Sequence, residues 1–415
     1  MNQEFWKSLI EKNDNFRTTC VLENCFNDKD KETFYKGVEE CLYKRINLNI
    51  LDDGIRIWRN GEQQNEEELK LFLKSNMPFE NEDLLEYCKR AFNEKFGIIL
   101  NNNECFSEKL ASRMVEMVNP LCELIGIPPL GYEITVFIGN YGWTPLGIHK
   151  DHVGENVLHF HLGPGRKQMY IWDDETYEKL VGKDVHNNEN IEPILSHAKK
   201  FDFGTGDLFY MPWFENHVGY SDEISIGVTL WFRSSDNNKF SKRILSNFIS
   251  QFIPLDNRII APQINYLENH DTLENFKESF GKYFDTENLK LNDFIESIYL
   301  DYKYSLISNG GWSKMPLEND INEIINDKLE RKKIILSTPF KILYKKINSE
   351  KLHIYVRGSR IRIKYHNEIV SFLDSLNSNK EIEIQSIIQE SSIPKESLLN
   401  FILVLFKYKG IVIID

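Results

Sequence analysis

The sequence predicts an α+β fold in which a β-barrel comes first, a helical domain follows, and a small mixed unit ends the chain. Strand-like segments separated by glycine- and proline-containing turns run from residue 132 to residue 232. After residue 236, apolar residues recur at helical spacing instead. The predicted domains are a barrel with N-terminal helices at 1–236, a helical domain at 237–335 and a C-terminal unit at 338–415.

Composition limits the classes of function. The chain has 415 residues, 41% of them hydrophobic, and a formal net charge of −13. This length suggests two or three domains. The acidity argues against a protein whose main role is to grip nucleic acid, since phosphate contacts need clustered Lys and Arg.

The lack of a recognisable targeting signal and the pattern of cysteines lead us to expect a cytoplasmic protein. The N-terminus lacks a basic region followed by an apolar run, and no apolar run approaches the ~20 residues that span a membrane. The six cysteines show no Cys-x-x-Cys spacing, so we expect reduced thiols rather than a zinc or iron–sulfur site.

The region before the barrel is predicted to mix helices and strands. The expected elements are a helix at 5–10, a strand at 55–59, helices at 66–74 and 106–125, and a strand at 132–138. Pro120 lies inside the helix expected at 106–125 and should kink or split it.

The motif His149-Lys150-Asp151 is the most informative in the chain. Residues i and i+2 of a β-strand point to the same side, so a strand would present His149 and Asp151 together to the barrel interior. His217 follows a Gly-Asp turn and a short strand at 206–211. Two imidazoles and one carboxylate hold one face of a ferrous ion and leave the other open. We therefore predict that His149, Asp151 and His217 bind Fe(II) and form the catalytic centre.

The surroundings make this motif more specific than a chance His-x-Asp pair, which is more often an exposed turn. A strand, a turn at Gly163-Pro164-Gly165 and a second strand are predicted between residues 156 and 172. The polar segment 173–200 is predicted to be an insertion on the barrel surface, and its histidines, His186 and His197, are assigned no ligand role.

The chain after the barrel is predicted to be mostly helical. Apolar stripes at helical spacing occur at 240–252 and 294–306. The C-terminal unit is predicted to contain a hairpin at 351–365, helices at 367–376, 382–389 and 395–408, and a strand at 411–414. This order resembles a winged helix.

The barrel motifs resemble those of the JmjC and cupin-like oxygenases. The resemblance covers residues 144–232 and rests on His149-Lys150-Asp151, on Gly165-Arg166-Lys167 at a strand start, and on the stretch from Gly206 to His217. It implies a double-stranded β-helix, the jelly roll of this family, with Fe(II) as cofactor and 2-oxoglutarate as cosubstrate.

The order of the three domains resembles the bacterial ribosomal oxygenase branch of that family. This resemblance implies a homodimer formed through residues 237–335 and a winged helix at 338–415. It also implies hydroxylation of a side chain in a polypeptide, either a ribosomal protein or a ribosomally made precursor peptide.

The cosubstrate needs a cation for its distal carboxylate. Lys167 matches the position of the basic residue that family members use, while Arg233 is the alternative, because other 2-oxoglutarate oxygenases place an arginine after the distal histidine. Asn156 is expected to contact the cosubstrate or a metal-bound water. His159 and His161 share a strand face and either line the pocket or pack within the barrel.

Two other classes of function are weighed against this one. A non-catalytic cupin-like regulator would use the basic residues between 341 and 364 to bind DNA, yet a regulator has no need of three metal ligands. A small-molecule cupin dioxygenase or isomerase would bind metal through His159 and His161. That site would leave His149-Lys150-Asp151 unexplained. The domains after the barrel also make a small-molecule enzyme less attractive.

Overall fold

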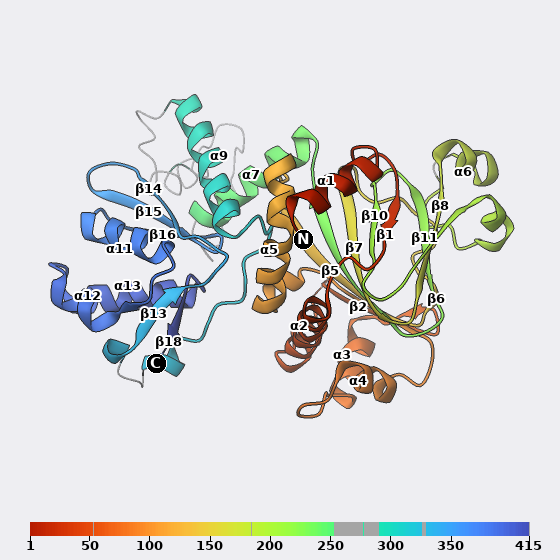
Figure 1. Cartoon of the computed structure of the whole chain (residues 1–415), viewed down its shortest axis with the longest axis horizontal. Coiled ribbons are helices and arrows are strands. Elements are labelled where there is room, and N and C mark those ends of the chain that lie inside the picture. The colour runs from red at the N-terminus through yellow and green to blue at the C-terminus, as the bar shows by residue number, and fades with distance from the viewer. Residues whose placement is uncertain (53, 184, 253–276, 278–289, 326–328, 415) are drawn as a thin grey trace, which may run out of the picture.

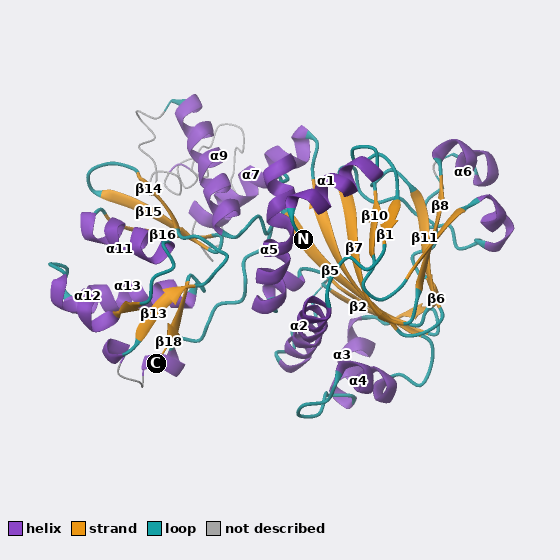
Figure 2. Cartoon of the chain, viewed as in Figure 1, coloured by secondary structure: helices purple, strands orange, loops and turns teal. Residues whose placement is uncertain are grey.

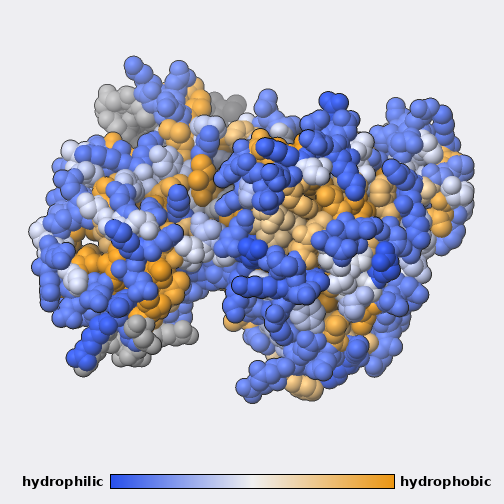
Figure 3. All heavy atoms as spheres, viewed as in Figure 1, coloured by the Kyte–Doolittle hydropathy of each residue, from blue (hydrophilic) through white to orange (hydrophobic). Residues whose placement is uncertain are grey.

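The computed structural model describes residues 1–52, 54–183, 185–252, 277, 290–325 and 329–414. The barrel and its covering helices form one lobe, at the right of Figure 1, and the C-terminal sheets and helices form the other. Figure 2 shows that strands dominate the first lobe, while helices α5, α7 and α9 lie between the two. On the face shown in Figure 3 the surface is mostly hydrophilic, with apolar side chains visible in patches on both lobes.

Eight consecutive strands form a double-stranded β-helix. One sheet places β10, β7, β12 and β5 side by side, and the facing sheet places β6, β11, β8 and β9 in that order. All of these pairs are antiparallel, and the alternation of strands between two sheets is that of a jelly roll. The predicted fold class is therefore confirmed. The strands are β5 (Tyr132–Gly139), β6 (Gly142–Trp143), β7 (Glu155–Pro164), β8 (Lys167–Trp172), β9 (Lys199–Phe203), β10 (Leu208–Met211), β11 (Asn216–Ser221) and β12 (Ser225–Arg233).

Strand alternation decides what each face of the larger sheet carries. Ile134, Leu158 and Leu230 point out of the barrel and belong to the main apolar core. Thr229 and His159, which face each other across β12 and β7, point inward. The outward face is covered by α1 (Gln3–Lys12), α2 (Asp28–Asn47) and α5 (Glu108–Ile125).

The larger sheet extends beyond the jelly roll on both edges. Next to β5 lie β4 (Phe96–Leu100), β2 (Ile55–Arg59) and β3 (Glu62–Gln63), and next to β10 lies β1 (Cys20–Leu22). Helices α3 (Glu66–Ser75) and α4 (Leu84–Ala91) complete this lobe, and the 3-10 helix η1 (Asn103–Cys105) precedes α5. All six cysteines are free.

Pro120 does not split its helix. Helix α5 runs without interruption from Glu108 to Ile125. An interior proline costs roughly 3 kcal/mol, whereas each large apolar side chain that is fully buried contributes roughly 1.5–3 kcal/mol. Met114, Met117 and Leu121 are all buried on this helix, so packing against the sheet outweighs the lost hydrogen bond.

The segment between β8 and β9 is an insertion, as predicted. It contains α6 (Asp174–Val181) and the 3-10 helix η2 (Glu192–His197). Tyr177 and Ile194 pack with Trp172 and Ile148 in a separate small core on the outside of the smaller sheet.

Among the described residues, two long helices follow the barrel. They are α7 (Asn237–Phe252) and α9 (Leu291–Ser308), which cover the two predicted apolar stripes, and a short helix, α10 (Asn322–Ile325), lies further along. Phe248 of α7 meets Phe294 of α9 edge to face, with ring centroids 5.3 Å apart. The segment that joins these two helices, residues 253–290 of the predicted helical domain, lies mostly outside the described residues. Within the described part of the chain, no helix has both the length and the apolar character required to cross a membrane.

The C-terminal unit contains the predicted hairpin, three helices and final strand. Its elements are η3 (Leu329–Arg331), β13 (Lys333–Leu336), β14 (Leu343–Lys346), β15 (Lys351–Val356), β16 (Ser359–Lys364), α11 (Asn367–Asn377), β17 (Ile382–Glu383), α12 (Ile384–Glu390), α13 (Lys395–Lys407) and β18 (Ile411–Ile414). Because β13 pairs with β17 and β18, this sheet includes residues that precede position 338. The unit has an apolar core of its own. Its assignment as a winged helix stays a prediction.

Two basic residues of the hairpin are buried, although alternating charges on a hairpin suggest a solvated face. Arg357 is 1% exposed, stacks on Phe340 and forms an ion pair with Glu108 of α5. Arg360 Nη1 lies 2.7 Å from Asp301 Oδ1 of α9. These guanidinium groups therefore attach the hairpin to α5 and α9.

Candidate metal centre

His149 and Asp151 lie in an irregular segment rather than in the regular strand that the sequence suggests. His149 joins β11 through one isolated bridge to His217, and Ile148 bridges Asn188 in the insertion. The left-handed backbone of Gly147 interrupts pairing just before this point, and Asp151 follows the bridge without a partner strand. The two side chains nevertheless meet His217.

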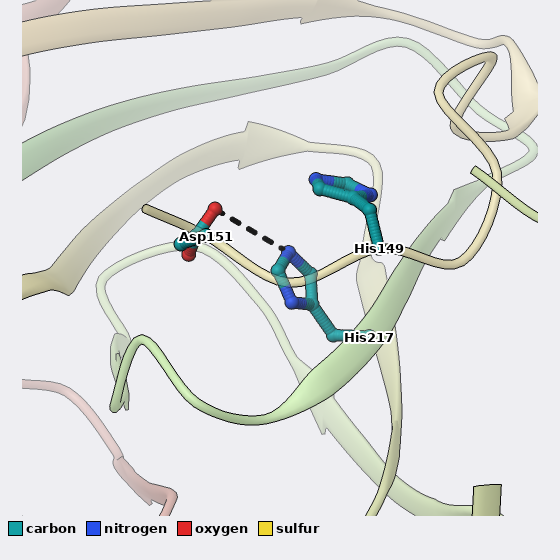
Figure 4. A group of neighbouring side chains, drawn as sticks. All are labelled: His149, Asp151 and His217. Carbon is teal, nitrogen blue, oxygen red and sulfur yellow. Dashed lines mark ion pairs between the residues drawn. The ribbon is translucent and has the colours of Figure 1, made fainter. Parts of the chain in front are cut away.

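The three predicted ligands form one cluster. Their candidate ligand atoms lie within 4.8 Å of one another, and Asp151 Oδ1 is 3.9 Å from His217 Nε2. Figure 4 shows the side chains converging, two from the irregular segment and one from β11. Within the described ranges, this is the group of three or more His, Cys, Asp or Glu side chains with the spacing of a metal site.

Backbone carbonyls fix the two imidazoles in the orientation that metal binding needs. His149 Nδ1 is 2.9 Å from the Gly147 carbonyl, and His217 Nδ1 is 3.1 Å from the Glu215 carbonyl. A carbonyl oxygen only accepts, so each Nδ1 carries the proton and each Nε2 keeps its lone pair. This outer-shell arrangement is usual for metal-binding histidines.

Burial sets the charge of the three side chains. It lowers the pKa of His149 to about 4 and that of His217 to about 4, so both rings are neutral near pH 7. Burial raises the pKa of Asp151 to about 7. Asp151 Oδ2 is buried without a hydrogen-bond partner among the described residues, which a cation at this position would remedy. The donor set therefore fits a divalent metal such as Fe(II).

The cluster opens into a cavity of about 880 Å³ between the two sheets. Inward-facing residues of the larger sheet form one wall, among them Phe137, Val157, His159 and Thr229. A cavity of this size matches the range typical of small-molecule and cofactor sites.

Lys167 enters this cavity from the start of β8. Its residue is 5% exposed, and its Nζ lies 4.8 Å from the ring centroid of Phe137 and 5.9 Å from that of Tyr141. Among the described residues it has aromatic neighbours but no hydrogen-bond or ion-pair partner. A buried ammonium group without a counter-charge is costly, so this position fits a ligand carboxylate.

Arg233 lines the same cavity but is already neutralised. Its Nη1 lies 2.7 Å from Glu133 Oε2, and its Nε lies 3.5 Å from Glu155 Oε1. Of the two predicted cations for a 2-oxoglutarate carboxylate, Lys167 is therefore the one with free binding capacity.

Asn156 lies off the cavity, contrary to its predicted role. It occupies the outward register of β7, between the inward Glu155 and Val157, and its Oδ1 accepts a hydrogen bond from the Trp213 N–H at 3.3 Å. Contact with a cosubstrate in the cavity is not supported by this position, because successive strand residues point to opposite faces.

The pair His159 and His161 is packed in the barrel. His159 Nδ1 lies 2.7 Å from Thr229 Oγ1, and His161 Nε2 lies 2.7 Å from the Gly165 carbonyl. The rings stack at 5.8 Å, and only His159 lines the cavity. The competing metal site at these two residues is not favoured, since no carboxylate completes it among the described residues.

Sequence reasoning missed several polar residues that line the cavity. Arg56, Glu133 and Glu155 lie on three different strands and all point inward. The sequence pattern that could have identified these cavity residues is a charged residue between apolar residues of a strand, such as Arg56 between Ile55 and Ile57.

No protein-family model matches the chain, and a search of curated proteins finds no match. Among solved structures, it is similar to the Escherichia coli protein YcfD. One YcfD structure has 14% identity and a TM-score of 0.49, covering 98% of this chain and 97% of the other. Another, described as a ribosomal oxygenase in complex with cobalt and 2-oxoglutarate, has 13% identity and a TM-score of 0.45, covering 98% of each chain.

A third solved structure is the non-heme α-ketoglutarate-dependent carbocyclase SnoK from nogalamycin biosynthesis. It has 12% identity and a TM-score of 0.35, covering 59% of this chain and 92% of the other. Ribosomal oxygenases are the group that the sequence motifs and domain order resemble.

Proposed function

We propose that this protein is an Fe(II)- and 2-oxoglutarate-dependent oxygenase that hydroxylates a side chain in a polypeptide. The observation that carries the proposal is the convergence, in one cavity, of two Nε2 lone pairs, the unpartnered Oδ2 of Asp151 and the ammonium group of Lys167, which is unpaired among the described residues. The first three match a ferrous ion, and the fourth matches the far carboxylate of a small dicarboxylate bound to it.

Each residue has a defined part in this proposal. His149, Asp151 and His217 would hold the iron on one face. Lys167 would bind the distal carboxylate of 2-oxoglutarate and so orient its other end toward the metal. When bound, iron and 2-oxoglutarate supply oxygen activation, with one oxygen atom going to the substrate and the other to succinate as carbon dioxide leaves. The walls around Phe137 and Val157 would exclude water from the site.

A polypeptide substrate is supported by the elements that lie after the barrel in the chain. The metal cluster and cavity are complete by Lys239, yet the chain continues through α7, α9 and a unit with its own core. The sheet β14-β15-β16 has two edge strands, and an extended peptide can add to such an edge through backbone hydrogen bonds. Ribosomal proteins and ribosomally made precursor peptides both fit this class.

A DNA-binding regulator is not favoured. Two of the basic hairpin residues, Arg357 and Arg360, are committed to Glu108 and Asp301 and are not free for phosphate contacts.

We also propose a homodimer through residues 237–335. Its support is the set of exposed apolar residues on α7 and α9, which include Leu245, Ile249, Leu291 and Ile295.

We expect the enzyme to act in the cytoplasm, where its six free thiols would stay reduced. The test of function is mass spectrometry of candidate ribosomal proteins and of precursor peptides encoded near the gene, after incubation with enzyme, iron, oxygen and 2-oxoglutarate. A gain of ~16 Da, one oxygen atom, is the expected result of cofactor-driven hydroxylation. Oxygen incorporated only into free metabolites would contradict a polypeptide substrate.

A further inference from the structure

The cavity wall extends past the jelly roll onto β2. Arg56 of β2 pairs with Ile99 of β4, which pairs with Phe137 of β5, so these three residues lie in one row across the sheet. All three line the cavity. Ile55 and Ile57, on the other face of β2, are buried in the main core and fix the strand so that Arg56 points inward.

Arg56 is the unpaired guanidinium of this cavity. The other arginine there, Arg233, is held by Glu133 and Glu155. Arg56 has no ion pair or hydrogen bond from its side chain among the described residues, its Nε is buried without a partner, and its guanidinium lies 5.7 Å from the centroid of the Trp58 ring.

The missing counter-charge has an energetic consequence. Arg56 is partly buried, and a guanidinium group is not deprotonated in proteins, so it cannot escape the cost of that burial by losing its charge. Burial lowers the pKa of Arg56, and no carboxylate among the described residues opposes this effect. A bound anion would offset the cost, and the planar fork of arginine suits a carboxylate held by two parallel hydrogen bonds.

Arg56 and Lys167 reach the cavity from different sheets, Arg56 from β2 of the larger sheet and Lys167 from β8 of the smaller one. Lys167 Nζ lies over Phe137, two strands away from Arg56 in the same row. Neighbouring strands are about 4.8 Å apart, so the backbones of Arg56 and of Phe137, over which the Lys167 ammonium lies, are roughly 10 Å apart across the sheet. In the proposed function the carboxylates of 2-oxoglutarate are taken by Lys167 and the metal, which leaves Arg56 for a second molecule.

We propose that Arg56 binds a carboxylate of the polypeptide substrate and thereby selects substrates with an acidic group at a fixed distance from the hydroxylated carbon. This inference rests on the proposed function and narrows it. The carboxylate belongs either to an aspartate or glutamate side chain or to the C-terminus of the substrate, since both present the same planar group to the guanidinium.

The test uses the full-length, iron-loaded enzyme with 2-oxoglutarate, oxygen and a peptide library made by digestion of cell protein. Mass spectrometry locates each added oxygen. We expect modified peptides to share a carboxylate at a constant spacing from the oxidised residue. Methyl esterification of the library, which neutralises its carboxylates, should abolish modification. Amidating the C-terminus, or replacing the acidic residue by its amide, then identifies which carboxylate Arg56 binds.

Variants separate this role from folding. Arg56→Gln should lower modification of acidic peptides by about 10- to 100-fold, the loss expected for one charged hydrogen-bonded contact. Arg56→Lys should restore part of it. Arg59→Gln is the matched control, because Arg59 lies on the same strand, faces away from the cavity and is paired with Glu94 at 2.5 Å. It should leave modification unchanged.

Binding of 2-oxoglutarate to each cobalt-loaded variant, measured by calorimetry, distinguishes a contact of Arg56 with the substrate from a contact with the cosubstrate. Unchanged binding in Arg56→Gln supports a substrate contact, and loss of binding would move Arg56 to the cosubstrate site and overturn the inference. Equal modification of esterified and free peptides by an active enzyme would overturn it while leaving the proposed function standing. A wild-type enzyme that binds iron and 2-oxoglutarate but modifies no peptide would overturn both.

Discussion

His149 and His217 exchange both of their backbone hydrogen bonds, although they lie 68 positions apart along the chain. The His149 N–H donates to the His217 carbonyl at 3.1 Å, and the His217 N–H donates to the His149 carbonyl at 2.9 Å. Residues paired in this way project their side chains to the same face, and the two rings lie 4.4 Å apart between centroids. The bridge therefore sets the separation of two ligands without a long strand.

The first prediction concerns metal binding. Replacing His149, Asp151 or His217 by alanine should each prevent stoichiometric binding of Co(II), an oxygen-stable substitute for Fe(II). The loss should exceed the roughly 10- to 100-fold cost of removing an outer-shell partner, because a ligand itself is gone. Calorimetry measures the affinity. His186→Ala is the control, since His186 lines the cavity outside the cluster. Wild-type affinity in the His217 variant would disprove the ligand set.

The second prediction concerns the cosubstrate. Lys167→Met should weaken 2-oxoglutarate binding by about 3–5 kcal/mol, because the far carboxylate would then be buried without its partner. Arg233→Gln should weaken it much less, since the Arg233 charge is already neutralised by Glu133 and Glu155. Anaerobic calorimetry on the cobalt-loaded proteins compares the two. The reverse order of effects would assign the carboxylate to Arg233.

The third prediction concerns the pH dependence of stability. Glu104 is 2% exposed, and burial raises its pKa from 4.5 to about 8. Between these values the folded state keeps a proton that the unfolded chain has released, so the free energy of unfolding falls as pH rises. The penalty is absent below pH 4.5 and complete above pH 8.

Glu104→Gln removes this titration while keeping an acceptor for the Ile134 N–H. The variant should gain little over wild type at pH 5 and be more stable at pH 8.5, by at most about 5 kcal/mol at ~1.4 kcal/mol per pKa unit. Urea unfolding at both pH values measures the difference. Glu178→Gln, which alters an exposed carboxylate on α6, serves as control and should show no such pH-dependent gain. A constant difference at both pH values would refute the assignment.

The fourth prediction concerns assembly. Leu245 of α7 and Ile295 of α9 are 49% and 51% exposed, respectively, which is costly for apolar side chains that no partner covers. We expect a homodimer at micromolar concentration and a monomer after the double change Leu245→Glu and Ile295→Glu. Light scattering gives the molar mass. Leu71→Glu, on exposed Leu71 of α3, should leave the dimer intact. A monomeric wild type would rule out this interface.

The barrel could be predicted from the sequence because its signals are local. Alternating apolar residues from Tyr132 to Phe232, with turns at Gly163-Pro164 and Gly206-Asp207, define each strand without knowledge of its partner. The spacing of His149 and Asp151 likewise indicated a shared direction. The irregular backbone there was not predictable, because it follows from a single bridge to a distant strand.

Other features depend on contacts between distant parts of the chain. Arg357 is buried because Glu108, 249 positions earlier, lies beside the hairpin, so its neighbours in sequence suggest only a basic surface. The inward direction of Arg56 depends on the pairing of β2 with β4. Asn156 was misassigned because its register on β7, and so the face that it occupies, is fixed by β10 and β12 rather than by the local sequence.

The most direct test of the account follows isotopically labelled 2-oxoglutarate as iron-loaded protein is exposed to oxygen in the presence of the peptide library. The account predicts that the wild type forms labelled succinate only with iron and oxygen, that peptides stimulate this conversion, and that Asp151→Ala forms none while remaining folded. Wild-type protein with one bound iron that forms no succinate, or an Asp151→Ala variant that forms as much as wild type, would contradict it.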